Sequence, residues 1–260
     1  MQRLILRLTP ALTVLALFAA WEALVRLAHI PHYTLPAPSL VLQTLWSNFG
    51  SLAGSWWFTL KITFGALVLA CAGGVLIAAV FALSRPVEVA LLPIAVMLQV
   101  TPIVAVAPLI LIYVESTTAA LLLCAWIVAF FPILSNTVIG LRAADVHLRD
   151  LFRLYRATPL QRLRLLLVPS ALPYFVAGLK ISGGLSLIGA VTAEMVAGAA
   201  GRETGLASRI LEASFRTETP KMFAALTLLV LTGVIIFWGF NALSRALLGR
   251  WHATESTRFD

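Results

Sequence analysis

The chain has few charged residues and an excess of apolar ones. Only 12% of its 260 residues are charged, 60% are hydrophobic, and the mean hydropathy is +0.96. Soluble domains average about 25% charged and about 45–50% apolar residues. A soluble core could not hide this much apolar side-chain surface from water, so a soluble domain is excluded. We predict an integral membrane protein that is surrounded by a lipid bilayer.

Cysteine and the common catalytic motifs are also scarce. Cys71 and Cys124 each lie in an apolar run without a CxxC pair, which indicates packing residues and excludes a disulfide scaffold. His29 and His32 are three residues apart but have no third ligand nearby, so we predict no metal site. The sequence has no HExxH, GxSxG or GxxxxGK[ST] motif. It therefore predicts no catalytic residue and no cofactor, and the chain is not expected to be an enzyme.

Hydrophobic segments long enough to cross a bilayer recur along the whole chain. A membrane-spanning helix needs about 20 predominantly apolar residues. Four uncharged segments meet this requirement, and two weaker ones, the first and the fifth, contain charged residues. Together they predict six transmembrane helices, at about 9–28, 60–84, 88–113, 117–140, 171–197 and 222–246. We expect an all-α fold in which residues 1–260 form one transmembrane domain. The segment between the first two spans contains three prolines and predicts a short surface helix starting near Ser39.

The positive charge has a topological explanation. A net charge of +8 could indicate nucleic-acid binding, but Lys and Arg also accumulate in the cytoplasmic loops of membrane proteins. Six spans with a cytoplasmic N-terminus place twelve basic residues inside, namely Arg3, Arg7, Arg85, Arg142, Arg149, Arg153, Arg156, Arg162, Arg164, Arg245, Arg250 and Arg258. Four lie outside, namely Arg202, Arg209, Arg216 and Lys221. This asymmetry predicts that both termini are cytoplasmic, and no nucleic-acid partner is needed to explain the charge.

Two ionisable residues lie inside the predicted fifth span. Lys180 and Glu194 are costly in lipid, so each is expected to face the protein interior, a cavity or an interface. They are 14 residues apart, about 21 Å along a helix, and cannot pair within one chain. Two interpretations remain open for Glu194. It belongs to the translocation path, or it makes a hydrogen bond at a helix end or between helices. Lys180 is the second candidate for the translocation path.

The predicted cytoplasmic loop between spans four and five, residues 141–170, contains an amphipathic helix. Leu148, Leu151, Phe152 and Tyr155 follow the spacing of one apolar helix face, whereas Arg149, Arg153 and Arg156 lie on another. Thr158-Pro159 predicts the start of a second helix. Periodicity alone leaves three interpretations: the first helix lies on the bilayer, packs on its own protein, or docks into a partner.

The sequence of this loop resembles the coupling segment of ABC importer permeases, the binding-protein-dependent transport system inner-membrane component family. The family pattern is Glu-Ala-Ala, three residues, Gly, nine residues, then Ile-x-Leu-Pro. Its Glu falls on Asp150, its two Ala on Leu151 and Phe152, its Gly on Arg156, and its final Pro on Pro169. The spacing and the second half fit, whereas Leu151, Phe152 and Arg156 depart from the pattern.

The resemblance implies the fold of type I importer permeases and a set of partners. The residues expected to couple to an ATP-binding subunit are Leu148, Arg149, Asp150, Leu151, Phe152, Tyr155, Arg156 and Pro169. Leu151 and Tyr155 would insert into that subunit, with Arg149 and Arg153 at the rim. Leu35-Pro-Ala-Pro, Ala193-Glu-Met and Gly205-Leu-Ala further resemble the nitrate/sulfonate/taurine-type branch, whose members also carry pyrimidines and riboflavin.

The family assembly would contain two permease subunits, here expected as a homodimer, two ATP-binding subunits and a periplasmic or tethered solute-binding protein. Such an assembly lies in the inner membrane of a bacterium. A secondary transporter or a subunit of another membrane complex is the alternative. Secondary carriers usually show intramembrane acids or broken helices in two related halves, and the sequence shows one acid and no evident symmetry.

Overall fold

The computed structural model describes residues 2–198 and 204–249, the first seven of these by their backbone alone. These described residues form helices joined by short connections, without strands. The helices are α1 (Gln2–Leu27), α2 (Pro38–Leu83), α3 (Arg85–Val100), α4 (Ile103–Tyr113), α5 (Thr117–Arg142), α6 (Val146–Leu154), α7 (Pro159–Arg162), the π-helix η1 (Leu163–Leu167), α8 (Val168–Ala197), α9 (Leu206–Phe215) and α10 (Thr219–Leu248). Three of the basic residues that were assigned to a side of the membrane lie outside the described residues, namely Arg202, Arg250 and Arg258.

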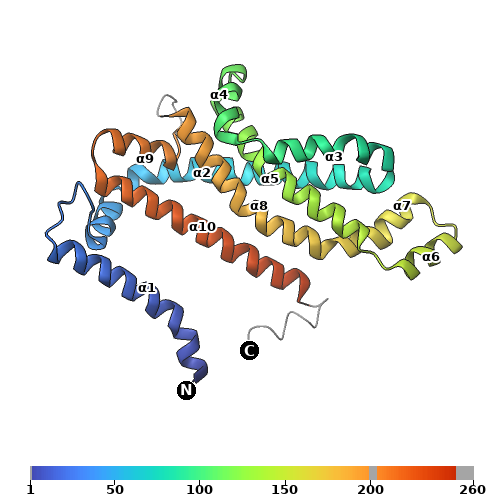
Figure 1. Ribbon diagram of the computed structural model, residues 1–260, viewed down its shortest axis with the longest axis horizontal. Helices are drawn as coiled ribbons and strands as arrows, with labels where there is room; N and C mark the ends of the chain where they lie inside the picture. Colours follow the sequence, from blue (N-terminus) through green and yellow to red (C-terminus); the bar gives the residue numbers. More distant parts are fainter. Residues whose placement is uncertain (1, 199–203, 250–260) are drawn as a thin grey trace.

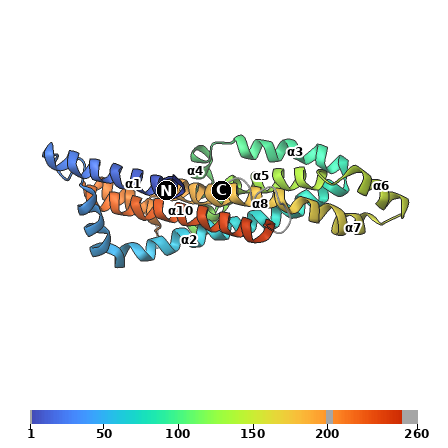
Figure 2. The same cartoon turned by 90° about the horizontal axis from the view of Figure 1, so that it is seen from below.

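The helices form an elongated bundle whose two ends differ. Figure 1 shows α9 and the connection from α1 to α2 at one end, and α6 with α7 at the opposite end. In the perpendicular view of Figure 2, α6 and α7 again project beyond the other helices. We call these the α9 end and the α6 end. Residues expected on opposite sides of the membrane, such as Arg209 and Arg149, thus lie at opposite ends of the bundle.

The predicted all-α membrane fold is confirmed. Five helices are long and apolar enough to cross a bilayer, and a bent pair of helices supplies the sixth candidate span. The five are Thr9–Leu27 within α1, Pro38–Leu83, Thr117–Arg142, Pro159–Ala197 and Thr219–Leu248. The number of spans predicted from the sequence agrees with the structure if the bent pair counts as one span.

The span predicted over 88–113 is divided into two helices by a sharp bend. α3 and α4 meet at an angle of 101° at the Thr101–Pro102 junction. A proline sterically disfavours the helical conformation of the residue before it, and Thr101 accordingly adopts φ −67° and ψ 120°. Figure 1 shows that α4 stands almost at right angles to the bundle axis.

The helix predicted to start near Ser39 does begin there, at Pro38, but it is not separate from the second span. Pro38–Leu83 is one helix of 46 residues, about 69 Å long, which absorbs both this segment and the second span. Its first residue is a proline, which suits a helix start because the first amide groups have no partner inside the helix. Ser39 is not the N-cap: its hydroxyl donates to Glu22 of α1 at 2.7 Å, which ties α1 to the start of α2.

The centre of the bundle is the packing of α5 between α2 and α8. Small residues permit the close approach: a Cβ atom at Gly178 would lie 2.8 Å from the carbonyl oxygen of Pro132. The hydroxyl of Ser182 on α8 donates to the Ala129 carbonyl of α5 at 2.7 Å. Without a hydrophobic driving force in lipid, such close contacts and interhelical hydrogen bonds are what hold membrane helices together. They give the two ends of the bundle a rigid connection.

Candidate functional site

Residues 141–170, which we call the coupling segment, form a helical projection at the α6 end. The Asp145 side chain caps α6 by accepting hydrogen bonds from the backbone amides of His147 at 2.7 Å and Leu148 at 3.3 Å. Thr158 and Gln161 form the capping box of α7, so the helix start predicted at Thr158-Pro159 is confirmed. From α7 the chain continues through η1 into α8 without a break.

The apolar face of α6 is divided between two directions. Phe152 is half-buried and packs on the protein's own core with Leu163. Leu148 (47%), Leu151 (45%) and Tyr155 (77%) are exposed. Of the four residues on the predicted apolar face, Phe152 thus packs on the protein's own core, whereas the other three are exposed. Leu154, the last residue of α6, is also exposed (79%) and was not identified from the sequence pattern.

Arg149 does not lie at the rim of this exposed face, contrary to the prediction. Its guanidinium Nη2 donates to the carbonyl oxygens of Arg142 and of Leu141, the latter at 3.4 Å, at the C-terminus of α5. A cation at this position satisfies carbonyl groups that have no partner inside the helix and complements the negative end of its dipole. Arg149 therefore ties α6 to the end of α5.

A buried carboxylate that sequence reasoning overlooked continues this connection. Glu88 of α3 is 3% exposed and forms ion pairs with Arg85, at 2.8 Å, and with Arg142 of α5. Arg142 thus joins α5 to α3, while its carbonyl oxygen receives Arg149 of α6. The signal available in the sequence was an isolated acid three residues after Arg85, at the start of an apolar run.

The remaining predicted coupling residues have different surroundings. Asp150 is exposed and lies 3.5 Å from Arg153 in a surface ion pair. Pro169 lies in the first turn of α8, directly after η1, where the Val168 amide bonds to the Leu163 carbonyl five residues earlier. The wider turn gives room for the proline ring, which in a regular helix clashes with the carbonyl four residues before it.

Arg156 occupies the position that the family pattern gives to glycine, and its backbone explains that preference. Its φ is +53°, in the left-handed region that favours glycine. The Ala157 amide donates to the Phe152 carbonyl, and the Arg156 amide donates to the Arg153 carbonyl, both at 2.9 Å. These two bonds form a Schellman motif, whose left-handed position is most often glycine. Arg156 therefore adopts the backbone conformation in which glycine is usual, and this conformation strains it.

Arg156→Gly is expected to stabilise the C-terminus of α6 by about 1 kcal/mol, because glycine relieves the left-handed strain. The amide of Ala157 should then exchange its hydrogen about fivefold more slowly, as measured by hydrogen–deuterium exchange. Arg153→Gly is the control, since it lies within α6, where glycine costs stability, and should accelerate exchange. Faster exchange in Arg156→Gly would contradict this explanation.

A second group of functional candidates lies at the α9 end. Glu194, near the end of α8, is 1% exposed. One of its carboxylate oxygens accepts the hydroxyl of Thr59 from α2 at 2.9 Å, and the other accepts the Ala207 amide of α9 at 3.0 Å. Thr59 in turn accepts the Leu206 amide at 2.9 Å. The carboxylate therefore caps the N-terminus of α9, where a negative charge is favoured. We call this set of bonds the Glu194 contact.

Gly205 completes the Glu194 contact. A Cβ atom at Gly205 would lie 2.1 Å from the Glu194 carboxyl carbon, so glycine alone leaves space for the carboxylate. The resemblances at Ala193-Glu-Met and Gly205-Leu-Ala thus belong to one structural unit. Lys180 is half-buried on α8 about 14 residues away, and in the described part of the chain it forms no ion pair. As expected from their spacing, the structure does not bring Lys180 and Glu194 together.

Comparison with known proteins identifies the chain. Residues 70–249 match the model of the family described as binding-protein-dependent transport system inner membrane component. The chain belongs to this family of ABC importer permeases. The predicted family is thereby confirmed, and the alternative of a secondary transporter is wrong.

Relatives with similar length support the assignment. A probable ABC transporter permease protein of Haemophilus influenzae is 32% identical over 91% of this chain and 95% of its own. The riboflavin transport system permease protein of Chloroflexus aurantiacus is 33% identical over 93% of this chain and 89% of its own. The formylaminopyrimidine transport permease protein of Halalkalibacterium halodurans is 32% identical over 95% of this chain and 98% of its own.

Solved structures show the same fold. A chain of the MetNI methionine ABC transporter, in inward-facing conformations, matches with a TM-score of 0.65 and 20% identity over 75% of this permease and 95% of that chain. As a family member, this multi-pass permease is a membrane subunit and not an enzyme. ATP hydrolysis belongs to separate ATP-binding subunits, and a substrate-binding protein completes the system.

Proposed function

We propose that this permease moves a small solute across the membrane and that α6 transmits the movement of its ATP-binding subunits. The observation that supports this most directly is the exposed apolar surface of Leu148, Leu151, Leu154 and Tyr155 at the projecting tip of the coupling segment. Exposed aliphatic and aromatic side chains that gather on one short helix are typical of a docking surface. We call these four residues the α6 surface.

The contacts that join α6 to α5 and α3 would transmit movement from the α6 surface to the rest of the bundle. When ATP closes the ATP-binding subunits, α6 would be displaced together with the end of α5, to which Arg149 binds. Arg142 and Glu88 would pass this displacement to α3 and the bent α3–α4 pair. Rigid-body movement of packed helices then converts closure at one end into opening at the other. Glu194 would hold α9 in place at that other end, and Lys180 remains a candidate for the solute path.

We further propose two copies of this permease in the bacterial inner membrane, with two ATP-binding subunits and a periplasmic or tethered solute-binding protein. The solute would be of the nitrate, sulfonate or taurine type, or a pyrimidine or riboflavin. These classes follow from the names of relatives, which include permeases for riboflavin, formylaminopyrimidine, aliphatic sulfonates and nitrate.

The proposal is tested by reconstitution. The permease is co-expressed with the ATP-binding subunits encoded beside it, purified and placed in proteoliposomes, and the solute that co-purifies with the neighbouring binding protein is supplied outside. Uptake that needs both the binding protein and ATP hydrolysis is expected, and a non-hydrolysable ATP analogue should abolish it. Uptake that follows a proton or sodium gradient in the absence of ATP would contradict the proposed function.

The orientation is a separate prediction. The distribution of basic residues predicts that the α6 end is cytoplasmic and the α9 end is external. A reporter fused after Thr204 or Ser47 should therefore be active on the external side, and one fused after Asp150 or at the C-terminus on the cytoplasmic side. A cytoplasmic signal from the Thr204 fusion would overturn the six-span topology.

A further inference from the structure

A small basic pocket lies at the α9 end, between α2 and the start of α9. Its volume is about 270 Å³, and its lining includes Ser51, Ser55, Phe58, Lys61, Thr204 and Arg209. The polar groups of this lining are three hydroxyls, one ammonium and one guanidinium, and none of the described residues that line it is acidic. Every one of these groups can donate a hydrogen bond, so the pocket is chemically suited to an acceptor with negative charge.

Lys61 lacks a counter-ion in the described part of the chain. Its Nζ atom lies 5.4 Å from the centroid of the Phe58 ring, and none of the ion pairs among the described residues includes Lys61. Lys61 is exposed on α2 and lies at the start of the predicted second span, about 60–84, at the α9 end of the bundle. The cation–π contact contributes only about 0.5–2 kcal/mol. An anion that enters the pocket would supply the missing partner.

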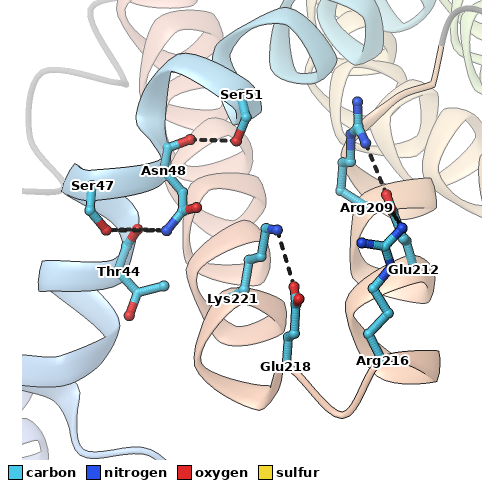
Figure 3. Close-up of polar contacts among 9 residues, drawn as sticks. All are labelled: Thr44, Ser47, Asn48, Ser51, Arg209, Glu212, Arg216, Glu218 and Lys221. Carbon is cyan, nitrogen blue, oxygen red and sulfur yellow. Dashed lines mark hydrogen bonds and ion pairs between the residues drawn. The ribbon is translucent and has the colours of Figure 1, made fainter.

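Arg209 is held in the pocket by fixed partners. Its Nε donates to the Ser55 hydroxyl at 3.0 Å, and its Nη1 donates to Glu212 at 2.9 Å. Glu212 also pairs with Arg216 at 2.9 Å, as Figure 3 shows, and the hydrogen bond from Arg209 helps to hold the pKa of Glu212 below its usual value. Since one carboxylate is shared between two guanidinium groups, the cluster keeps a positive charge next to Lys61.

The hydroxyl groups provide further donors at fixed positions. Ser55 is 3% exposed and accepts from Arg209, which leaves its own proton for another acceptor. Ser51 lies one helical turn before Ser55 on the same face of α2, at the edge of the group drawn in Figure 3. Ser55 lies one helical turn before Thr59, which belongs to the Glu194 contact. The pocket therefore lies next to the hydrogen bonds that join α2, α8 and α9.

We propose that this pocket binds an oxyanion, such as the sulfonate, carboxylate or phosphate group of a small molecule, between Lys61 and Arg209. The inference rests on the proposed function, because it places the site where solute would enter or leave the permease. The same chemistry is offered by a free solute and by the headgroup of an anionic lipid. The pocket's volume suits either a small solute or one headgroup, and the test separates the two sources.

The test uses a cysteine reporter in the purified complex of permease and ATP-binding subunits, held in phosphatidylcholine nanodiscs. Cys71 and Cys124 are replaced by alanine, and Ser51→Cys supplies the reactive thiol. Its reaction rates with sulfonatoethyl and trimethylammonioethyl methanethiosulfonate are each divided by that reagent's rate with a free thiol. The anionic reagent is expected to be favoured about tenfold, because the two cations concentrate anions in the pocket.

Charge variants decide whether the pocket causes the preference. Lys61→Gln should reduce the ratio of the two rates to about threefold or less, and Lys61→Arg should restore it. Arg245→Gln removes an equal charge from the end of α10, in the other half of the bundle, and should leave the ratio unchanged. Slowing of the reaction by free ethanesulfonate would identify a solute site. Slowing by phosphatidylglycerol in the nanodisc, but not by ethanesulfonate, would identify a lipid headgroup site.

The failures of the two proposals can be told apart. A ratio near one in a complex that retains its ATP-binding subunits would overturn the anion site and leave the proposed function standing. The same ratio in Lys61→Gln as in the parent complex would also overturn it. Absence of the ATP-binding subunits from the purified sample would instead count against the proposed function.

Discussion

Replacing both Leu151 and Tyr155 with alanine is expected to weaken the binding of the ATP-binding subunits by about 2 kcal/mol or more, a factor of about 30 in Kd. Both side chains belong to the exposed α6 surface, at 45% and 77% exposure. Buried aliphatic and aromatic anchors dominate the energy of most interfaces. The double variant should insert into the membrane normally and co-purify with little ATP-binding subunit, and any ATP that the remaining complex hydrolyses should not drive uptake.

Arg153→Ala is the matched control for this variant. Its side chain is 73% exposed on the same helix and pairs with Asp150, so its loss should change binding much less, as is usual for a charge at an interface rim. Arg149 is unsuitable as a control because it binds the end of α5. A double variant that keeps its ATP-binding subunits and transports normally would show that the α6 surface is not the docking surface.

Gly205→Ala is expected to destabilise the α9 end by about 3 kcal/mol or more. The new Cβ atom would lie 2.1 Å from the Glu194 carboxyl carbon, and the carboxylate would have to leave the Thr59 hydroxyl and the Ala207 amide. Hydrogen bonds to a charged group contribute about 1.5–3 kcal/mol each. The thermal unfolding midpoint of the purified permease should fall by about 6–12 °C, and uptake should be lost.

Gly184→Ala on α8 is the control, because a Cβ atom there has no neighbour within 4 Å and the substitution should be nearly neutral. Combining Gly205→Ala with Glu194→Ala provides a second test. If the glycine serves to accommodate the carboxylate, the two losses of stability should be much less than additive. Full additivity, or a neutral Gly205→Ala variant, would contradict the Glu194 contact as the reason for this glycine.

The spans could be predicted from the sequence because their signal is local. A helix in lipid needs about 20 apolar residues in a row, and no distant contact is required to recognise it. The position of the bend at Thr101, in contrast, could not be predicted from the local sequence. Pro93, Pro102 and Pro108 all lie in the predicted third span, yet Pro93 and Pro108 remain within helices. Which of three prolines interrupts a helix depends on the packing around it.

The candidate sites were predictable only in part, because their partners are distant in sequence. The spacing of α6 identified its apolar side chains but not the turning of Phe152 toward the core cluster. Glu194 was recognised from its cost in lipid, whereas Thr59, its partner, lies 135 residues earlier. The ion pair between Glu88 and Arg142 spans 54 residues. Sequence patterns that extend over three or four residues cannot detect contacts between residues so far apart. The sequence therefore indicated which residues are unusual, and the structure shows their partners.

Site-directed photo-cross-linking tests the central claim, that α6 contacts the ATP-binding subunit, most directly. A photoreactive phenylalanine analogue is placed at Leu154 of α6 or at Phe215 of α9 in the co-expressed complex. The two positions are equally exposed, at 79%, and lie at opposite ends of the bundle. We predict an adduct between permease and ATP-binding subunit from Leu154 and none from Phe215. An adduct with that subunit from Phe215, or none from Leu154 in a complex that transports solute, would contradict the account.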